Sequence, residues 1–434
     1  MQDSLHLLKS RRFLPLFVTQ FLGAFNDNLF RTAMVLLVIY GVYGDPQHEA
    51  AFSAVAGGLF ILPFFLLSAL AGQLADSGDK ARIIRIVKTA EIAIMLFGAA
   101  GLVLQNVPLL LIALTAMGVH STFFGPIKYA ILPQHLTDDE VLGGTGLVEA
   151  GTYIAILGGT LLGGVLVARG SDGLFHAEYA AVVVILVALI GRWVGGMVPP
   201  APPATDAPPL TMDWHIVRAS ITLVNATLHI RRLFLAILAI SFFWAMGAVL
   251  AAQFPPLVKN ALGSDQSVAT LVLGVFSIGV AMGSVAVNRL LKGEVSARYS
   301  PGSALMMGLF VLDLYRRVKG WPTTVEADGL RDLDAFLTVP NSWLIVVDLL
   351  GVAIAGGMFV VPLYAFLTTT VAKSQTARTV AANNIVNAGF MVLASLLLTG
   401  AVLLGVTVAD SLLIVAIATV ISAWLAWLLH KACA

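Results

Sequence analysis

The residues best suited to chemistry lie together in one apolar stretch near the start of the chain. They are Asn26, Asp27, Asn28 and Arg31. Charged side chains are costly in a stretch that spans a membrane, and they are usually kept there for function. Asp27 and Arg31 are four positions apart, so on a helix they share one face and partly neutralise each other. The pattern predicts a substrate or ion site, and the alternative is a self-compensating pair that only holds helices together.

Other polar side chains occur within later apolar stretches. His120 precedes Lys128 by about two helical turns, and we expect Pro126 to break the helix beside Lys128. Lys128 is either a gating residue or a lysine that extends to the membrane interface. We count as further substrate-binding candidates His120, Glu149, Trp244, Gln253, Asn383, Asn384 and Asn387. The three asparagines suit a polar headgroup or a helix contact equally.

Small residues recur every four positions in the stretch that begins near Glu149. They are Gly151, Ala155, Gly159 and Gly163. This spacing is typical of close helix packing. It also makes the stretch a candidate sliding edge through which a lipid could pass sideways. A second apolar stretch could face it with Gly274, Gly279 and Gly283.

The composition of the chain places it in a membrane. Apolar residues make up 59% of it and charged residues only 11%, whereas soluble domains carry about 25% charged residues. The net charge of +1 and the absence of a basic patch argue against a nucleic-acid partner. A single cysteine, Cys433, rules out an internal disulfide and a cysteine metal site. The sequence has no phosphate-binding Gly-x-x-x-x-Gly-Lys loop, and we expect neither an enzyme nor a cofactor.

Apolar stretches long enough to span a membrane, about 20 residues each, divide into six and six around a proline-rich segment. They lie at about 13–42, 51–74, 82–105, 107–132, 141–169, 177–198, 232–258, 267–291, 301–319, 341–370, 379–404 and 409–430. We therefore predict an all-α, polytopic membrane protein with twelve transmembrane helices. Its expected parts are a first six-helix bundle (1–198), a linker (199–231) and a second six-helix bundle (232–434). Within the linker, 214–230 reads as an amphipathic helix on the membrane surface or as a plain connection.

Lysine and arginine collect on one side of this arrangement, which predicts that both termini are cytoplasmic. The two halves also echo each other in sequence. Residues 126–132 (PIKYAIL) resemble 362–367 (PLYAFL), and 148–151 (VEAG) resemble 386–389 (VNAG) at a similar spacing. Parallel halves related by a repeat are typical of facilitator-type transporters.

The loop 72–84 (GQLADSGDKARII) resembles the signature loop between the second and third spans of the major facilitator superfamily. Its Gly72 would let helices approach closely, Asp76 would lie near a helix N-terminus, and Lys80 and Arg82 would stay in water. We group the expected gating residues of the two halves. They are Gly72, Asp76, Lys80, Arg82, Lys128, Glu294 and Arg298.

Longer strings resemble one bacterial branch of that superfamily, the lysophospholipid transporter family. They are 20–28 (QFLGAFNDN), 123–136 (FFGPIKYAILPQHL), 146–152 (GLVEAGT), 294–299 (EVSARY) and 381–388 (AANNIVNA). The resemblance implies that the protein flips lysophospholipid from the outer to the inner leaflet of the bacterial inner membrane for reacylation. It also implies an acyltransferase and an acyl carrier protein synthetase as partners, since some members are fused to both. We expect a monomer surrounded by membrane lipid.

Carried over residue by residue, the resemblance places the family's intramembrane acid at Asp27, its span-four lysine at Lys128 and its acid after span eight at Glu294. Because Lys128 and Glu294 lie at inner helix ends in opposite halves, we expect them to meet as a cytoplasmic gate when the outer side is open. The family's basic residue in span seven has no counterpart here, because 244–253 holds neither arginine nor lysine. Arg31 is the expected substitute as partner of Asp27. Two alternatives stay open. One is a facilitator that carries another amphipathic molecule, and the other is a membrane anchor that docks an acyltransferase without transport.

Overall fold

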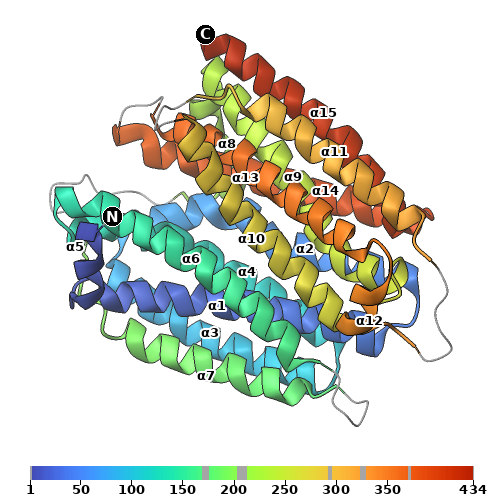
Figure 1. Cartoon of the computed structure of the whole chain (residues 1–434). Coiled ribbons are helices and arrows are strands. Elements are labelled where there is room, and N and C mark those ends of the chain that lie inside the picture. The colour runs from blue at the N-terminus through green and yellow to red at the C-terminus, as the bar shows by residue number, and fades with distance from the viewer. Residues whose placement is uncertain are drawn as a thin grey trace. The chain divides into compact units, whose positions relative to one another are not determined.

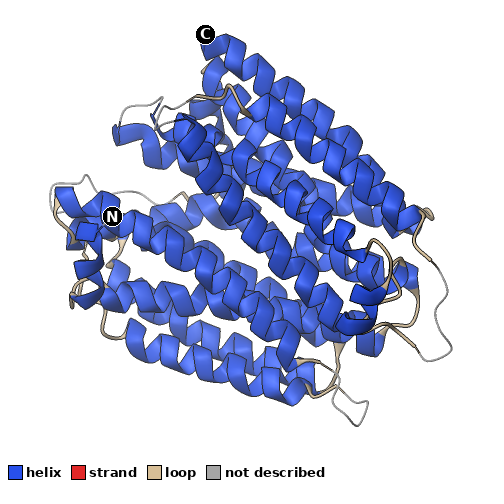
Figure 2. Cartoon of the chain, in the orientation of Figure 1, coloured by secondary structure: helices blue, strands red, loops and turns tan. Residues whose placement is uncertain are grey.

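Helices form nearly all of the regular structure in the computed structural model (Figure 2), which describes residues 2–168, 175–202, 213–291, 296–322, 329–369 and 373–433. A short 3₁₀ helix (Gln2–Lys9) precedes the first long helix. The α-helices labelled in Figure 1 are α1 (Leu14–Leu37), α2 (Pro46–Ser77), α3 (Lys80–Val103), α4 (Val107–Ala130), α5 (Leu132–His135), α6 (Asp138–Leu166), α7 (Ala177–Gly195), α8 (Ile216–Leu228), α9 (Arg231–Asn260), α10 (Gln266–Leu291), α11 (Ser300–Lys319), α12 (Leu333–Thr338), α13 (Ser342–Thr369), α14 (Lys373–Leu403) and α15 (Val408–Cys433). Helices are expected in lipid, because each one satisfies its own backbone hydrogen bonds.

Ten helices in the described ranges are long and apolar enough to cross a membrane. They are α1, α2, α3, α4, α7, α9, α10, α13, α14 and α15. Helices α6 and α11 occupy the other two predicted stretches, so the count of twelve spans remains a prediction. The expected break at Pro126 is wrong, because α4 continues past it to Ala130. A helix forms within the predicted linker, as α8, and its place on the membrane surface stays a prediction.

Local capping chemistry sets where several helices begin. Asp79 accepts a hydrogen bond from the backbone N–H of Ala81 at 3.0 Å and so caps α3. Its Oδ1 also accepts from the backbone N–H of Ala201 at 2.9 Å, which fixes the start of the linker against the same turn. Thr137 and Glu140 form a capping box at the start of α6.

The helices cluster into two compact units, each described here by itself. Unit 1 comprises Met1–Leu37 and Leu66–Ser220, and unit 2 comprises Val38–Phe65 and Ile221–Ala434. In unit 1, α1 packs against α6 and α7, and α3 packs against α4 and α7. In unit 2, α9 packs against α14 and α15, and α11 packs against α13 and α15. The same pairing therefore recurs after a shift of six spans, as expected of two repeated halves.

The small-residue stripe of α6 is a packing surface against α1. A Cβ at Gly159 would clash with the backbone oxygen of Phe25, and one at Gly163 would lie 2.6 Å from the backbone oxygen of Leu29. Glycines 279 and 283 of α10 pack in the same way against α13. These four glycines therefore pack against a helix of their own unit, and the expected sliding edge stays a prediction. Gly72 is also not at a close approach, since a Cβ there would meet no atom within 4 Å.

We predict that Gly159→Ala destabilises the protein, because the added methyl group would force α6 away from the backbone of α1. Overpacking of this kind typically costs about 1–3 kcal/mol. Gly72→Ala is the matched control, since the same methyl group there has open space and improves helix propensity. Thermal unfolding of the two purified variants tests this. A Gly159→Ala protein as stable as Gly72→Ala would show that the helices can separate freely.

One end of unit 1 is held together by the carboxylate of Glu140. Arg12 Nη2 lies 2.6 Å and His6 Nε2 lies 3.2 Å from its Oε1. The backbone N–H of Thr137 donates to its Oε2 at 3.0 Å. The Thr137 N–H, with help from His6 and Arg12, lowers the pKa of Glu140 to about 2 from an ordinary value of 4.5. The ionised form thus ties the chain start to the first turn of α6.

A lowered pKa gives stability that is present above the unfolded value and is lost as the carboxylate takes up its proton. For Glu140 the loss is expected between about pH 4.5 and pH 2. We predict that the unfolding temperature of the wild-type protein falls more steeply across this window than that of Glu140→Gln. Parallel curves for the two proteins between pH 5 and pH 3 would refute the assignment.

Candidate functional site in unit 1

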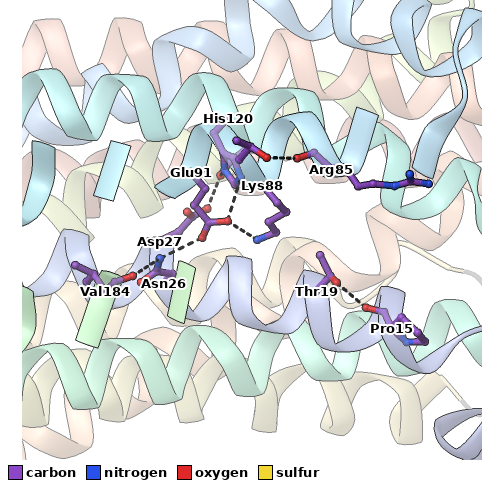
Figure 3. Close-up of polar contacts among 11 residues, drawn as sticks. Pro15, Thr19, Asn26, Asp27, Arg85, Lys88, Glu91, His120 and Val184 are labelled. Carbon is purple, nitrogen blue, oxygen red and sulfur yellow. Dashed lines mark hydrogen bonds and ion pairs between the residues drawn. The ribbon is translucent and has the colours of Figure 1, made fainter. Parts of the chain in front are cut away.

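Four helices of unit 1 bring a buried ion pair and its partners together (Figure 3). On α3, Lys88 Nζ lies 2.6 Å from Glu91 Oε2, and the two side chains are 0% and 1% exposed. They are three positions apart and so face each other across one turn. Charges this deeply buried must neutralise each other where they lie, because an unpaired one would cost several kcal/mol.

The carboxylate of Glu91 is the centre of the cluster. Asn26 on α1 donates from Nδ2 to Glu91 Oε1 at 3.1 Å and to the backbone oxygen of Val184 on α7 at 3.2 Å. His120 on α4 places Nε2 3.4 Å from Glu91 Oε2. A lysine, an amide and an imidazole thus surround one carboxylate, and Figure 3 shows them converging on it. The cluster links α1, α3, α4 and α7.

A glycine makes room for the lysine. A Cβ on Gly23 of α1 would lie 2.8 Å from Lys88 Nζ. Gly191 and Gly195 of α7 border the same side chain, and Cβ atoms there would lie 3.7 Å and 3.6 Å from it, at ordinary van der Waals contact. Phe124 of α4 completes the slot, with its ring centroid 5.4 Å from Nζ, a distance at which the ring attracts the cation. The residues that surround Lys88 therefore accommodate its buried side chain.

Asp27 lies at the edge of this cluster. Ser121 Oγ donates to Asp27 Oδ2 and lies 3.5 Å from His120 Nδ1, so Asp27 is connected through α4 to the ion pair. The Oδ1 atom of Asp27 is buried and has no hydrogen-bond partner among the described residues. A carboxylate oxygen that is desolvated and unpaired is a ready acceptor for a cation or a hydroxyl donor.

The other two polar residues of α1 bond along their own helix. Asn28 Nδ2 donates to the backbone oxygen of Ala24 at 2.8 Å. Arg31 Nη2 donates to Asn28 Oδ1 at 3.4 Å. Both are half-buried. Asn28 directly follows Asp27, and Arg31 lies about one helical turn beyond Asp27, so α1 extends the polar region toward its C-terminal end.

Unit 2 holds a separate polar cluster without charge. Ser241 of α9 donates to Asn387 Oδ1 at 2.6 Å, and Asn387 Nδ2 lies 3.2 Å from the hydroxyl of Tyr364 on α13. Trp244 Nε1 donates to the same hydroxyl at 3.0 Å. One turn from Asn387, Asn383 is fully buried with neither amide atom hydrogen-bonded in the described part of the chain.

Two predicted substrate-binding residues of unit 2 lie apart from this cluster. Asn384 is exposed on the outside of α14, so only two of the three asparagines share a face. Gln253 is buried near the end of α9, where Nε2 donates to the backbone oxygen of Ala50 at 3.4 Å. Sequence reasoning missed Tyr364, although it stands in the repeated string 362–367.

Sequence reasoning did not single out Lys88 and misplaced Lys80. Lys88 is completely buried, and the sequence signal that marks it is the acid three positions later, Glu91. Lys80 was expected in water, yet it is 6% exposed at the start of α3, where its backbone N–H donates to Ala201. Arg82 is exposed as expected.

The remaining gating candidates give less information. Arg298 is exposed, with its guanidinium 4.7 Å from the ring centroid of Tyr299, and Lys128 is half-buried on the last turn of α4. The side chains of Asp76 and Glu149, and the whole of Glu294, lie outside the described residues. The predicted pairing of Lys128 with Glu294 therefore stays a prediction.

Comparison with known families agrees with the repeated helix pairing. A family model described as Major Facilitator Superfamily matches residues 16–315, well over half of the chain. The chain belongs to the major facilitator superfamily. Its fold is therefore the facilitator fold that the signature loop predicted. Membership of this family makes the protein a transporter and not an enzyme.

Relatives within the superfamily are named as lysophospholipid transporters, the branch that the sequence resembles. The chain is 28% identical to "Lysophospholipid transporter LplT" of Citrobacter koseri over 416 residues, which cover 94% of each protein. It is 27% identical to the protein of the same name from Serratia proteamaculans over 365 residues, covering 83% of this chain and 80% of that one. These similarities confirm the family resemblance read from the sequence.

Solved structures confirm the fold. A POT family peptide transporter superposes with a TM-score of 0.71 at 10% identity, covering 97% of both chains. A bacterial homologue of the lysosomal transporter Spinster gives 0.67 at 16% identity and 98% coverage of both. At these identities the likeness concerns the facilitator fold alone.

We predict that Lys88→Met and Glu91→Gln each destabilise the protein by about 3–5 kcal/mol, because each leaves a buried charge without its partner. The double variant should lose less than the sum of the two, since it buries no unpaired charge. Arg218→Met is the control, because the Arg218–Asp213 pair of unit 1 is exposed to solvent and contributes little to stability. Strictly additive losses in thermal unfolding would show that the two side chains do not interact.

Proposed function

We propose that this facilitator transports lysophospholipids across the bacterial inner membrane, from the outer to the inner leaflet. The observation that carries the proposal is the similarity to lysophospholipid transporters over nearly the whole chain. The unpaired oxygen of Asp27 supports it. A headgroup that bears an ammonium or hydroxyl group could supply the hydrogen bond that this oxygen lacks.

A lipid with one acyl tail and a polar headgroup suits the distribution of polar and apolar side chains in unit 1. The polar atoms of unit 1 gather on a few helices within otherwise apolar surroundings, so a headgroup would be held while its tail stays in contact with apolar side chains or lipid. Each CH₂ group exposed to water would cost about 0.8 kcal/mol. We therefore propose that the substrate enters sideways from the membrane, by alternating access, and not through the aqueous phase.

The proposed topology places both termini in the cytoplasm, as the lysine and arginine distribution predicts. Lysophospholipid delivered to the inner leaflet would then meet a cytoplasmic acyltransferase that restores its second chain. In this scheme the transporter supplies the substrate for phospholipid remodelling and performs no covalent chemistry itself.

We predict that Asp27→Asn lowers the rate of lysophospholipid flipping at least about tenfold, which corresponds to one lost charge-assisted hydrogen bond of roughly 1.4 kcal/mol or more. The measurement follows a labelled lysophospholipid from the outer to the inner leaflet of proteoliposomes. Asp410→Asn is the matched control, because Asp410 makes a partly exposed pair with Lys319 in unit 2.

Three results are informative. Loss of flipping in Asp27→Asn but not in Asp410→Asn supports the proposal. Normal flipping by a well-folded Asp27→Asn protein would remove Asp27 from the substrate site. Wild-type protein that flips no lysophospholipid, while still binding an acyltransferase, would favour the membrane-anchor alternative.

A further inference from the structure

One amide of unit 2 is buried without any hydrogen bond. Asn383 on α14 is 0% exposed, and neither its Oδ1 nor its Nδ2 has a partner among the described residues. The buried amides of Asn26 and Gln253 differ, because each of them donates through its nitrogen. An unpaired buried polar group is rare in a folded protein and costly to keep. Asn383 is therefore a candidate for binding a group that the protein itself does not supply.

Asn383 adjoins the uncharged cluster formed by Ser241, Trp244, Tyr364 and Asn387. It lies four positions before Asn387, so the two asparagines share one face of α14. The four side chains of the cluster hydrogen-bond to one another. A group that binds beside them has to be neutral, because an ion would find no counter-charge among these five side chains.

Free space borders one side of this cluster. Trp244 and Tyr364 are half-buried, whereas Asn383 is fully buried. Gly247 lies one turn beyond Trp244 on α9, and a Cβ there would meet no atom within 4 Å. The cluster thus has an accessible side, which carries the two aromatic residues, and a buried side, which carries the unpaired amide.

A primary amide is matched by a hydrogen-bond donor and an acceptor that stand next to each other, since its oxygen accepts and its nitrogen donates. A lysophospholipid carries such a pair in its glycerol, where the free hydroxyl is next to the carbon that bears the acyl ester. The hydroxyl can donate to Oδ1 of Asn383, and the ester carbonyl can accept from Nδ2. A lipid with two acyl chains offers only acceptors here, so it would leave Oδ1 unpaired.

We propose that Asn383, with the uncharged cluster beside it, binds the free glycerol hydroxyl and the neighbouring ester carbonyl of the lipid and so selects one-tailed over two-tailed phospholipids. The amide becomes reachable when Trp244 and Tyr364 move aside. This inference rests on the proposed transport function and adds the part of the substrate that unit 2 recognises. A site that hydrogen-bonds a substrate hydroxyl rejects an analogue without it, because the polar atoms of the site are then left unpaired.

Two lipids that differ in one hydroxyl test the selection. The probe is an acyl-labelled lysophosphatidylethanolamine, whose only hydroxyl is on glycerol, and the comparison is its deoxy analogue, which has hydrogen in place of that hydroxyl. Wild-type protein in proteoliposomes should flip the hydroxyl-bearing lipid at least about tenfold faster. Asn383→Leu should flip both lipids at one rate. Thr399→Val should keep the wild-type preference and is the matched control, because the Thr399 hydroxyl on the same helix donates to the backbone oxygen of Ser395.

Ligand-induced stabilisation gives a second readout that needs no transport. In detergent, the hydroxyl-bearing lipid should raise the unfolding temperature of wild-type protein more than the deoxy lipid does, because it binds the folded state more tightly. Asn383→Leu should respond equally to the two lipids. If Asn383→Leu does not accumulate, Asn383→Ala replaces it in both assays.

The outcomes separate this inference from the transport proposal. Equal flipping of the two lipids by wild-type protein would overturn the selection, and a preference that survives in Asn383→Leu would overturn the role of Asn383. Wild-type protein that flips neither lipid would instead overturn the transport proposal. The shifts in unfolding temperature would then decide whether Asn383 binds the hydroxyl.

Discussion

The burial of Glu91 is the constraint on which the rest of unit 1 depends. A carboxylate that is 1% exposed must have its charge balanced on the spot, and Lys88 provides the balance at 2.6 Å. The lysine in turn needs space on α1, which Gly23 provides by lacking a side chain, since a Cβ there would lie 2.8 Å from Nζ. One ion pair therefore constrains residue types on α1 and α3. It also fixes the orientation of α1, because Asn26 bonds to the same carboxylate.

This arrangement explains how Asp27 can remain incompletely satisfied. The neighbouring positions are occupied by rigid partners, since Asn26 is tied to Glu91 and Val184, and Ser121 is tied to Asp27 itself. With α1 held on both sides, Asp27 cannot turn to find another donor. Such strain is tolerated when the surrounding structure is firm, and it is typical of sites where a ligand supplies the missing interaction.

The sequence predicted the positions of the helices well but the ion pairs between buried side chains poorly, for a physical reason. Hydrophobic length marks a span locally, so stretches such as 82–105 and 232–258 agree closely with α3 and α9. Burial of a charge is decided by partners on other helices. Lys88 follows three other basic residues of α3, Lys80, Arg82 and Arg85, and it is buried because Glu91 neutralises it and Gly23 of α1 leaves space for it. Glu49 on α2 and Lys259 on α9 form an ion pair although they come from opposite halves of the sequence, and no local pattern indicates this pair.

The two units use one packing scheme for different chemistry. The repeat aligns VEAG of α6 with VNAG of α14, which places Glu149 opposite Asn387 in the two halves. The neutral residue of that pair belongs to the hydroxyl and amide cluster of Ser241, Trp244 and Tyr364, whereas the polar cluster of unit 1 contains the titratable side chains of Lys88, Glu91 and Asp27. Packing requires small residues between paired helices in both units, as at Gly159 of α6 and Gly283 of α10. Under the proposed function, the charged groups of a headgroup would be recognised in unit 1 and the uncharged ones in unit 2.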